Sequence, residues 1–525
     1  LGDVYKRQKE NKMKKIYKSL VFTMATIALT SCVNDWLDLT PSDSIPSNSA
    51  ITNYNDAKTA LYGMYDGLQG NSTYTQYYAS RMFYYGDVRG DDMQARTQGM
   101  RSSSCYEMKY TIDDAPNMWN VQYNVLRRAN RLIEAVENNK ITDAEKNQAN
   151  VNNIYAQAKS VRALVHFDLV KVYGMPYSFD NGASMGVPIV TTPIDPLNAS
   201  AIPGRNTVAE VYTQIVKDLT EAIDSKALNV SKSAGDNQGF IDEWAAKALL
   251  TRVYIYMGKN QEALDMAKNI IENSPYSLWT KAQYANAWDK NNANHINEMI
   301  FELVNSGSDD WADREGIAYL YHEDGYADAI CTKSFVDMLA QDPSDVRLDV
   351  ILPVQLKTDD NGKPTDMYKT YGDNRIFINK FPMGSLGDMR LNNLPILRLS
   401  EVYLNAAEAA AKLNDKTSTA KYLNEIIKNR TDDTKQLVTE STATLERVLL
   451  ERRKELVGEG QRFFDAMRNN ETVTRYTNED EKGWHYSINK ESQVFDRTYF
   501  RTILPIPVSE TNANPTLKAQ QNPGY

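Results

Sequence analysis

Two polar, aromatic segments of the chain carry the side chains best suited to bind a ligand. They span residues 84–106 and 305–326, and both contain glycine. Flat aromatic rings match the apolar C–H faces of a sugar, while carboxylate, amide and guanidinium groups match its hydroxyls. The segments therefore predict a sugar-binding surface, although each ring taken alone could instead be half-buried loop packing. The candidate ligand-binding residues are Asp92, Arg96, Arg101, Tyr106, Trp311, Tyr319, Tyr321 and Tyr326.

Catalytic chemistry has weaker support in the same region. Asp87, Asp91 and Asp92 could be read as the carboxylates of a glycosidase, whose paired carboxyl groups stand roughly 5 to 9.5 Å apart. Neighbouring Asp side chains in a Gly-containing loop more often cap turns, and nothing around them in the sequence indicates an acid with a raised pKa. We therefore expect a binding protein with no catalytic residue.

Metal sites and disulfides are not predicted either. The four histidines stand singly, and the chain has no HExxH or CxxC motif, so zinc is not expected. Clustered Asp oxygens would suit calcium, but the spacing of an EF-hand is absent; we expect no cofactor and leave a structural calcium open. Cys105 and Cys331 could pair in an oxidising compartment, although two cysteines so far apart in sequence predict nothing reliable.

The distribution of charge argues against nucleic acid as a partner. The formal net charge is −9, and phosphate binding needs clustered cations that this chain lacks. The most charged run, residues 451–465, alternates in sign. It predicts a helix in which Arg452, Glu455, Glu459 and Arg462 form structural ion pairs.

Helical hairpins are the strongest recurring pattern in the chain. At residues 243–257 and 261–272, small and aliphatic side chains recur at helical spacing, and Gly258 separates the two runs. Such a pair resembles a tetratricopeptide repeat, in which small residues let two helices pack closely. One pair cannot bury its own apolar face, so several must stack; we expect about four. Further pairs are predicted at residues 399–429 and at residues 152–173 with 207–224.

The segments between these pairs have a different texture. They are rich in Gly, Asn, Asp, Pro and aromatic residues, and long loops of this kind are often functional. The run at residues 299–304 fits a helix or a strand, and Trp279 and Trp288 are expected in the core. We predict a mainly α fold: one compact unit with a scaffold of helical hairpins, a large irregular region and a few short strands. The irregular segments are residues 70–118, 274–396 and 470–525.

The start of the chain is typical of an exported precursor. Residues 13–31 hold a basic stretch and then a short apolar run, as in a secretory signal. The run is too short to span a bilayer, which needs roughly 20 residues. Cys32 follows and resembles the acylated cysteine of a bacterial lipobox. Residues 1–12 are interpreted as non-native upstream sequence.

Several motifs follow one another along the chain: CVNDWLDLTPSD near the start, LPILRLSEVYLNAAEA and ERRKELVGEGQRFFDAMR near the end, and the final NPGY. In this order they resemble the SusD/RagB family of outer-membrane nutrient-binding lipoproteins of Bacteroidetes. The resemblance covers residues 32–525, with an N-terminal part at 32–270 and a C-terminal part at 271–525. In this family the helical repeats face a transporter, and loops in the regions of 84–106 and 305–326 contact the ligand.

The resemblance implies a function in binding and delivery. Members capture an oligosaccharide and pass it to a SusC-like TonB-dependent transporter in the outer membrane. The chain is then expected to be anchored in the outer membrane by lipid on Cys32, facing the cell exterior. A peptide-binding RagB-like member of the same family remains an alternative, as do a helical-repeat adaptor and a glycosidase.

Overall fold

The computed structural model describes most of the chain beyond its first residues. Contacts between residues separate 1–52 from Asn53–Tyr525, which forms one compact unit. The expected upstream segment, the signal peptide and Cys32 lie outside the described residues. The described residues are 50–70, 77–96, 101–193, 203–289, 295–305, 315–322, 325–351, 376–381, 388–475, 485 and 488–525.

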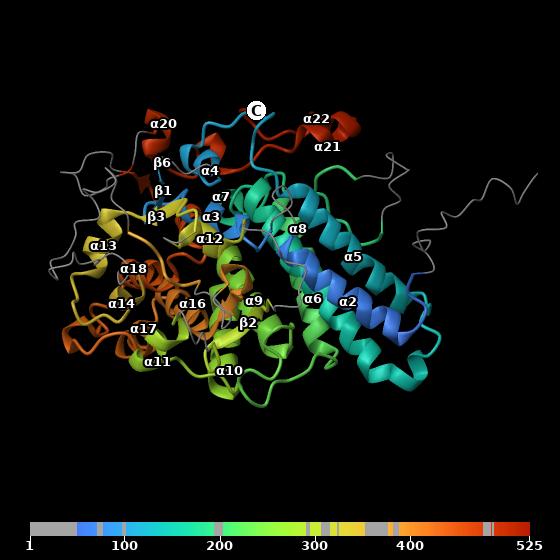
Figure 1. The fold of residues 1–525 in the computed structure, drawn as a ribbon, viewed down its shortest axis with the longest axis horizontal. Coiled ribbons are helices and arrows are strands. Elements are labelled where there is room, and N and C mark those ends of the chain that lie inside the picture. The colour runs from blue at the N-terminus through green and yellow to red at the C-terminus, as the bar shows by residue number, and fades with distance from the viewer. Residues whose placement is uncertain are drawn as a thin grey trace, which may run out of the picture. The chain divides into compact units, whose positions relative to one another are not determined.

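Long helices packed side by side form the scaffold, which confirms the predicted mainly α fold. The sequence of neighbours is α2, α5, α6, α8, α9, α10, α16 and α17, and α18 packs on α16 (Figure 1). The scaffold helices are α2 (Tyr54–Gln69), α5 (Trp119–Glu137), α6 (Gln148–Tyr173), α8 (Val208–Asp224), α9 (Glu243–Met257), α10 (Asn260–Asn273), α16 (Leu399–Lys412), α17 (Lys416–Lys428) and α18 (Leu445–Leu456).

The hairpin of α9 and α10 shows why these segments fold as pairs. Asp242 caps the first helix by accepting a hydrogen bond from the Ala245 N–H at 2.8 Å. Gly258 ends it with a φ of 70°, a left-handed conformation that glycine adopts without strain. The chain then reverses into α10, whose buried residues include Ala263 and Ala267. Small side chains at this contact let the two helices approach closely.

Short helices and two-stranded sheets fill the irregular segments. β1 pairs antiparallel with β3, β2 with β4, and β5 with β6. The apolar run at residues 299–304 is therefore a strand, β2. The strands are β1 (Met93–Ala95), β2 (Met299–Leu303), β3 (Ala329–Cys331), β4 (Leu394–Arg398), β5 (Val473–Thr474) and β6 (Val494–Phe495). The shorter helices are α3 (Arg81–Asp87), α4 (Ser103–Glu107), η1 (Ala144–Asn147), α7 (Tyr177–Asp180), α11 (Lys281–Ala287), α12 (Ile317–Tyr321), α13 (Lys333–Leu339), α14 (Arg347–Ile351), η4 (Met389–Leu391), η5 (Thr434–Gln436), α19 (Arg462–Arg468), α20 (Lys490–Gln493), η7 (Phe500–Thr502), α21 (Val508–Ala513) and α22 (Pro515–Ala519).

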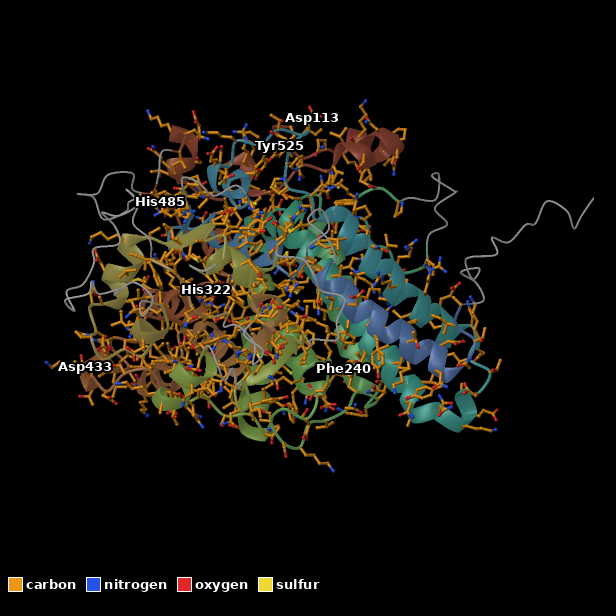
Figure 2. The ribbon with its side chains drawn as sticks, in the orientation of Figure 1. Asp113, Phe240, His322, Asp433, His485 and Tyr525 are labelled. Atoms are coloured by element: carbon orange, nitrogen blue, oxygen red, sulfur yellow. The ribbon has the colours of Figure 1, made fainter. Side chains whose placement is uncertain are left out.

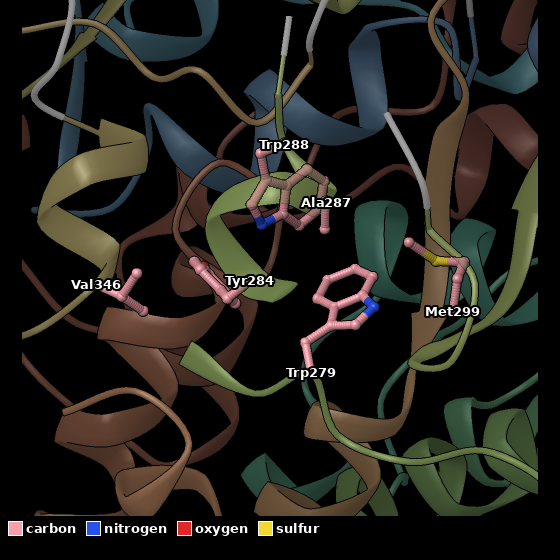
Figure 3. Close-up of a cluster of buried hydrophobic side chains, with 6 residues drawn as sticks. All are labelled: Trp279, Tyr284, Ala287, Trp288, Met299 and Val346. Carbon is pink, nitrogen blue, oxygen red and sulfur yellow. The ribbon is translucent and has the colours of Figure 1, made fainter. Parts of the chain in front are cut away.

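A cluster of buried aromatic and aliphatic side chains packs inside the irregular region. Trp279 and Trp288 are both buried and meet edge to face, with ring centres 5.5 Å apart. Tyr284, Met299 and Val346 complete the cluster (Figure 3). The prediction that both tryptophans belong to the core is confirmed.

Beside this cluster lies a network of fully buried ions. Arg398 contacts Glu298 at 2.6 Å and Glu455 at 3.0 Å. Arg430 contacts the same two carboxylates at 3.1 and 2.9 Å, and Arg347 reaches Glu455 at 3.3 Å. Burial opposes ionisation of Glu455, but Arg430 and Arg398 outweigh it and hold its pKa well below the usual range.

The charged run at residues 451–465 forms structural ion pairs, as predicted. The prediction that the run is a single helix is wrong, because α18 ends at Leu456 and α19 begins at Arg462. Arg452 contacts Asp465 at 3.2 Å, Glu459 contacts Lys380 at 2.8 Å, and Arg462 contacts Asp91 at 2.6 Å. The run therefore connects distant segments of the fold.

Replacing Glu455 by Gln should destabilise the protein strongly. Three guanidinium groups would lose a shared carboxylate in the interior, and breaking a buried ion pair costs about 3–5 kcal/mol. The free energy of unfolding, measured by urea denaturation, should fall by this amount. Glu446→Gln, on the exposed side of the same helix, should lower it by less than about 1 kcal/mol. Equal losses in the two variants would contradict a stabilising role for the network.

Candidate functional site

The two segments predicted to bind ligand meet in the fold. β1 pairs with β3 so that Gln94 lies opposite Ile330. The Asp328 carboxylate accepts hydrogen bonds from the backbone N–H groups of Arg101 at 3.1 Å and Ser102 at 2.9 Å. The Arg96 N–H donates to the Asp328 carbonyl at 2.8 Å. Asp328, which the sequence analysis did not single out, lies just beyond the second segment and binds the first; the two segments also meet directly, since Arg101 contacts Glu315 and Tyr321 contacts Asp87.

A partly exposed group of side chains stands at this junction, and we call it the Arg101 patch: Arg101, Glu315, Tyr319 and Tyr326. The Arg101 guanidinium lies over the Tyr326 ring, with its carbon 3.7 Å from the ring centre. Its Nη2 also donates to Glu315 at 2.7 Å, and this hydrogen bond raises the pKa of Arg101. The Tyr319 and Tyr326 rings are 5.7 Å apart and tilted by 45°. The patch offers two rings beside a fixed donor and acceptor pair.

The backbone holds the two rings of the patch together. Tyr326 N–H donates to the Tyr319 carbonyl at 2.6 Å, across a turn that follows α12. A Cβ at Gly325 would stand 2.4 Å from that carbonyl oxygen, so only glycine allows this approach. His322, labelled in Figure 2, marks the end of α12 beside the patch.

Three of the other candidate residues lie in the interior. Asp92 is 1% exposed and pairs with Arg453; Tyr106 is 3% exposed. Tyr321 is fully buried and its hydroxyl donates to Asp87 at 2.8 Å. These side chains hold segments together, and a buried ring cannot offer its face to a sugar. Of the rest, Arg96 is partly exposed near the patch.

Trp311 lies outside the described residues, as do most residues of the loop that carries it. The sequence analysis missed Glu315, although it lies within the second segment. Nothing in the sequence distinguished Glu315, because an isolated Glu in a polar loop is common. Its role comes from its contact with Arg101, which the sequence does not show.

Asp87 corrects one expectation from the sequence. Burial raises its pKa to about 8, although hydrogen bonds from Tyr321 and the Gly460 N–H lower it. An acid with a raised pKa is therefore present in this loop, contrary to the sequence analysis. The side chain is only 2% exposed, with its oxygens bonded to Tyr321 and Gly460. It is enclosed by the protein, and its raised pKa reflects structural burial.

The remaining carboxylates of the loop are held by cations. Asp91 accepts hydrogen bonds from the Nε and Nη2 atoms of Arg462 at 2.6 and 3.1 Å. Burial opposes ionisation of Asp91, but Arg462 and Arg453 hold its pKa well below the usual range. Asp92 accepts from Arg453 Nε at 3.1 Å. Both carboxylates are therefore engaged in salt bridges with arginines.

Metal ligation and disulfide formation find no support in the described part of the chain. There, no three or more His, Cys, Asp or Glu side chains are grouped so that they could hold a metal ion. Cys105 and Cys331 are both buried free thiols. Burial raises the pKa of Cys105 to about 12. Across the same described residues, no helix combines the length and apolar character needed to cross a membrane.

The fold is a helical scaffold that carries an irregular face with the Arg101 patch on it. The sequence profile of the SusD family matches residues 224–525. The profile of a second family, described as starch-binding and associating with the outer membrane, matches residues 35–255. The chain belongs to the SusD family.

Known relatives agree with this assignment over almost the whole chain. SusD-like protein P25 of Formosa agariphila is 23% identical, covering 97% of this chain and 100% of its own. The crystal structure of a SusD superfamily protein from Bacteroides thetaiotaomicron has a TM-score of 0.78 at 38% identity, covering 90% of this chain and 100% of its own. A laminarin-binding SusD-like protein shares the fold, with a TM-score of 0.64 at 23% identity, covering 90% and 100%.

Asp87→Asn should change how stability depends on pH. In the unfolded chain an Asp ionises near pH 4, whereas the folded protein keeps Asp87 protonated up to about pH 8. Between these values each rise in pH favours the unfolded wild type, and Asn has no such dependence. The variant should therefore gain about 2.5 kcal/mol relative to wild type between pH 5 and pH 7. Urea denaturation at several pH values measures this, and parallel curves would contradict the assignment.

Proposed function

We propose that the protein is a surface glycan-binding lipoprotein that captures an oligosaccharide and delivers it to a SusC-like TonB-dependent transporter. Membership of the SusD family supports binding of carbohydrate at the outer membrane. The observation that carries the proposal is the Arg101 patch, where two irregular segments bring paired rings and a fixed guanidinium together at a partly exposed position.

The chemistry of the patch suits a saccharide. Glu315 holds Arg101 over one face of Tyr326, so the guanidinium is fixed before any ligand arrives. Groups that are already fixed lose little entropy on binding. N–H groups of Arg101 that Glu315 does not use can donate to sugar hydroxyls, and Glu315 can accept from them. The tilted ring of Tyr319 supplies apolar surface for the C–H face of a sugar ring.

We propose that the protein binds its ligand without cleaving it. A glycosidase needs an acid and a second carboxylate that both reach the glycosidic bond. Here Asp87 is enclosed, and Asp91 and Asp92 are held by Arg462 and Arg453. These contacts support a binding role for the described part of the face.

Delivery to the transporter would follow from lipid anchoring. Acyl chains on Cys32 would hold the protein at the outer membrane, since each buried CH₂ contributes roughly 0.8 kcal/mol. We infer that the stacked helices, as tetratricopeptide-like pairs, meet the transporter while the irregular face meets the ligand. Anchoring raises the effective concentration of a weakly bound glycan at the transporter.

Arg101→Ala and Tyr326→Ala should weaken glycan binding. Wild type should be retarded in native gels containing starch or laminarin. Arg101→Ala should bind at least about tenfold more weakly, since removing a hydrogen bond to a charged group costs about 1.5–3 kcal/mol. Tyr326→Ala should bind about two- to tenfold more weakly, because it removes an aromatic contact. Tyr155→Ala is the control, because Tyr155 is half buried and contacts Lys159 on a scaffold helix.

Unchanged binding in both patch variants would move the site elsewhere. Failure of wild type to bind any soluble polysaccharide, together with binding of peptides in the same assay, would favour the peptide-binding alternative.

Cys32→Ala should abolish lipidation. Cells expressing wild type and fed radiolabelled palmitate should incorporate label into the protein, and the variant should incorporate none and leave the membrane fraction. Label that persists in the variant would show that Cys32 is not the anchor.

A further inference from the structure

A hollow opens on the scaffold, away from the Arg101 patch. It has a volume of about 590 Å³ and lies between α2, the loop before α9 and the end of β2. Figure 2 labels Phe240 in this region, well apart from His322 beside the patch. We call it the Tyr62 pocket. Its lining residues that carry the argument are Tyr62, Asp66, Asp236, Gln238, Phe240 and Val304.

Two aromatic rings stand open to solvent in this pocket. Tyr62 is 47% exposed and Phe240 is 37% exposed, and their ring centres are 6.0 Å apart. Val304 beside them is 49% exposed. Large apolar groups gathered at one exposed place commonly mark a binding site, whereas scattered ones need no explanation.

The pocket is held in shape by buried partners. Phe240 meets the buried Tyr65 ring edge to face at 5.2 Å. The Tyr65 hydroxyl donates to Gln157 at 2.7 Å and accepts from the Ile241 N–H at 2.9 Å. Gln238 forms two hydrogen bonds with Glu302. The Gln238 Nε2 donates to the Glu302 carboxylate at 2.6 Å, and the Gln238 backbone carbonyl accepts from the Glu302 N–H at 3.0 Å. The exposed rings are therefore mounted on a rigid support.

The polar side chains of the pocket indicate what kind of ligand it fits. Among the described residues, its lining includes the carboxylates of Asp66 and Asp236 and the amides of Asn237 and Gln238, but neither Lys nor Arg. Two cations contact lining residues from outside: Arg128 pairs with Asp66 at 3.2 Å and offsets its charge, and Lys58 lies 5.8 Å from the Tyr62 ring centre. The Asp236 carboxylate and the two amides remain as polar groups of the lining. Carboxylates and amides can form hydrogen bonds with neutral hydroxyls. The carboxylates would repel an anionic chain.

We propose that the Tyr62 pocket is a second saccharide-binding site, selective for neutral glycans. The proposal rests on the proposed function and adds a second contact for the same class of ligand. Asn305 beside the pocket and Glu315 of the patch are ten residues apart in sequence. At most about 36 Å therefore separates them. A glycan chain long enough to reach both places would bind more tightly than one held at either place alone.

Tyr62→Ala and Phe240→Ala test the proposal in native gels that contain starch, laminarin or the anionic polymer alginate. Each variant should bind a neutral polysaccharide roughly five- to tenfold more weakly than wild type, as expected for the loss of one stacking ring. Phe179→Ala is the matched control, since Phe179 is 40% exposed and lies outside this pocket. It should bind like wild type, and alginate should bind more weakly than the neutral polymers.

The outcomes separate this proposal from the proposed function. If Arg101→Ala binds glycan more weakly than wild type while both pocket variants bind it like wild type, the proposed function stands and the second site is overturned. A change in self-association of the pocket variants, with unchanged glycan binding, would make the pocket an interface between copies and also overturn it. Tighter binding of alginate than of the neutral polymers would overturn the selectivity. If wild type binds none of the polymers, both proposals fail.

Discussion

A set of buried ion pairs fastens the irregular segments to the helical scaffold. Glu298 precedes β2, Arg398 ends β4, Arg430 follows α17 and Glu455 lies in α18, yet their charged groups contact one another in the interior. A buried charge without a partner is strongly unfavourable, so these segments can be buried only together. Loops that lack regular secondary structure thereby acquire fixed positions.

The binding face depends on this arrangement through a chain of contacts. Arg453, two residues before Glu455 on α18, pairs with Asp92 just before β1. β1 pairs with β3, and Asp328 beside β3 binds the backbone at Arg101. The orientation of Arg101 over Tyr326 is thus set by contacts that reach back to the core. A site of this kind is formed before ligand binds, which reduces the entropy lost on binding.

Polar residue types serve two different purposes in this protein. In the interior, Asp91 and Asp92 neutralise arginines and hold loops together. At the surface, Glu315 keeps a guanidinium available to a ligand. In the Tyr62 pocket, exposed aromatic rings likewise stand on residues that are fixed by hydrogen bonds. The same residue types therefore stabilise the interior and form the exposed patch that we propose as the binding site.

Sequence alone predicted three helical pairs, at residues 243–272, at 399–429 and at 152–173 with 207–224, because helical periodicity and small-residue contacts depend on near neighbours. It placed Trp279 and Trp288 in the core but did not single out α2 or α5. It also indicated that the charged run at 451–465 is structural. Only the tertiary structure decided that Arg101 and Tyr326 meet while Tyr321 is enclosed, and that β2 is a strand. The physical reason is that exposure and pKa depend on partners far away in sequence. Residue type gives the chemistry of a side chain, whereas long-range contacts decide whether that side chain reaches solvent.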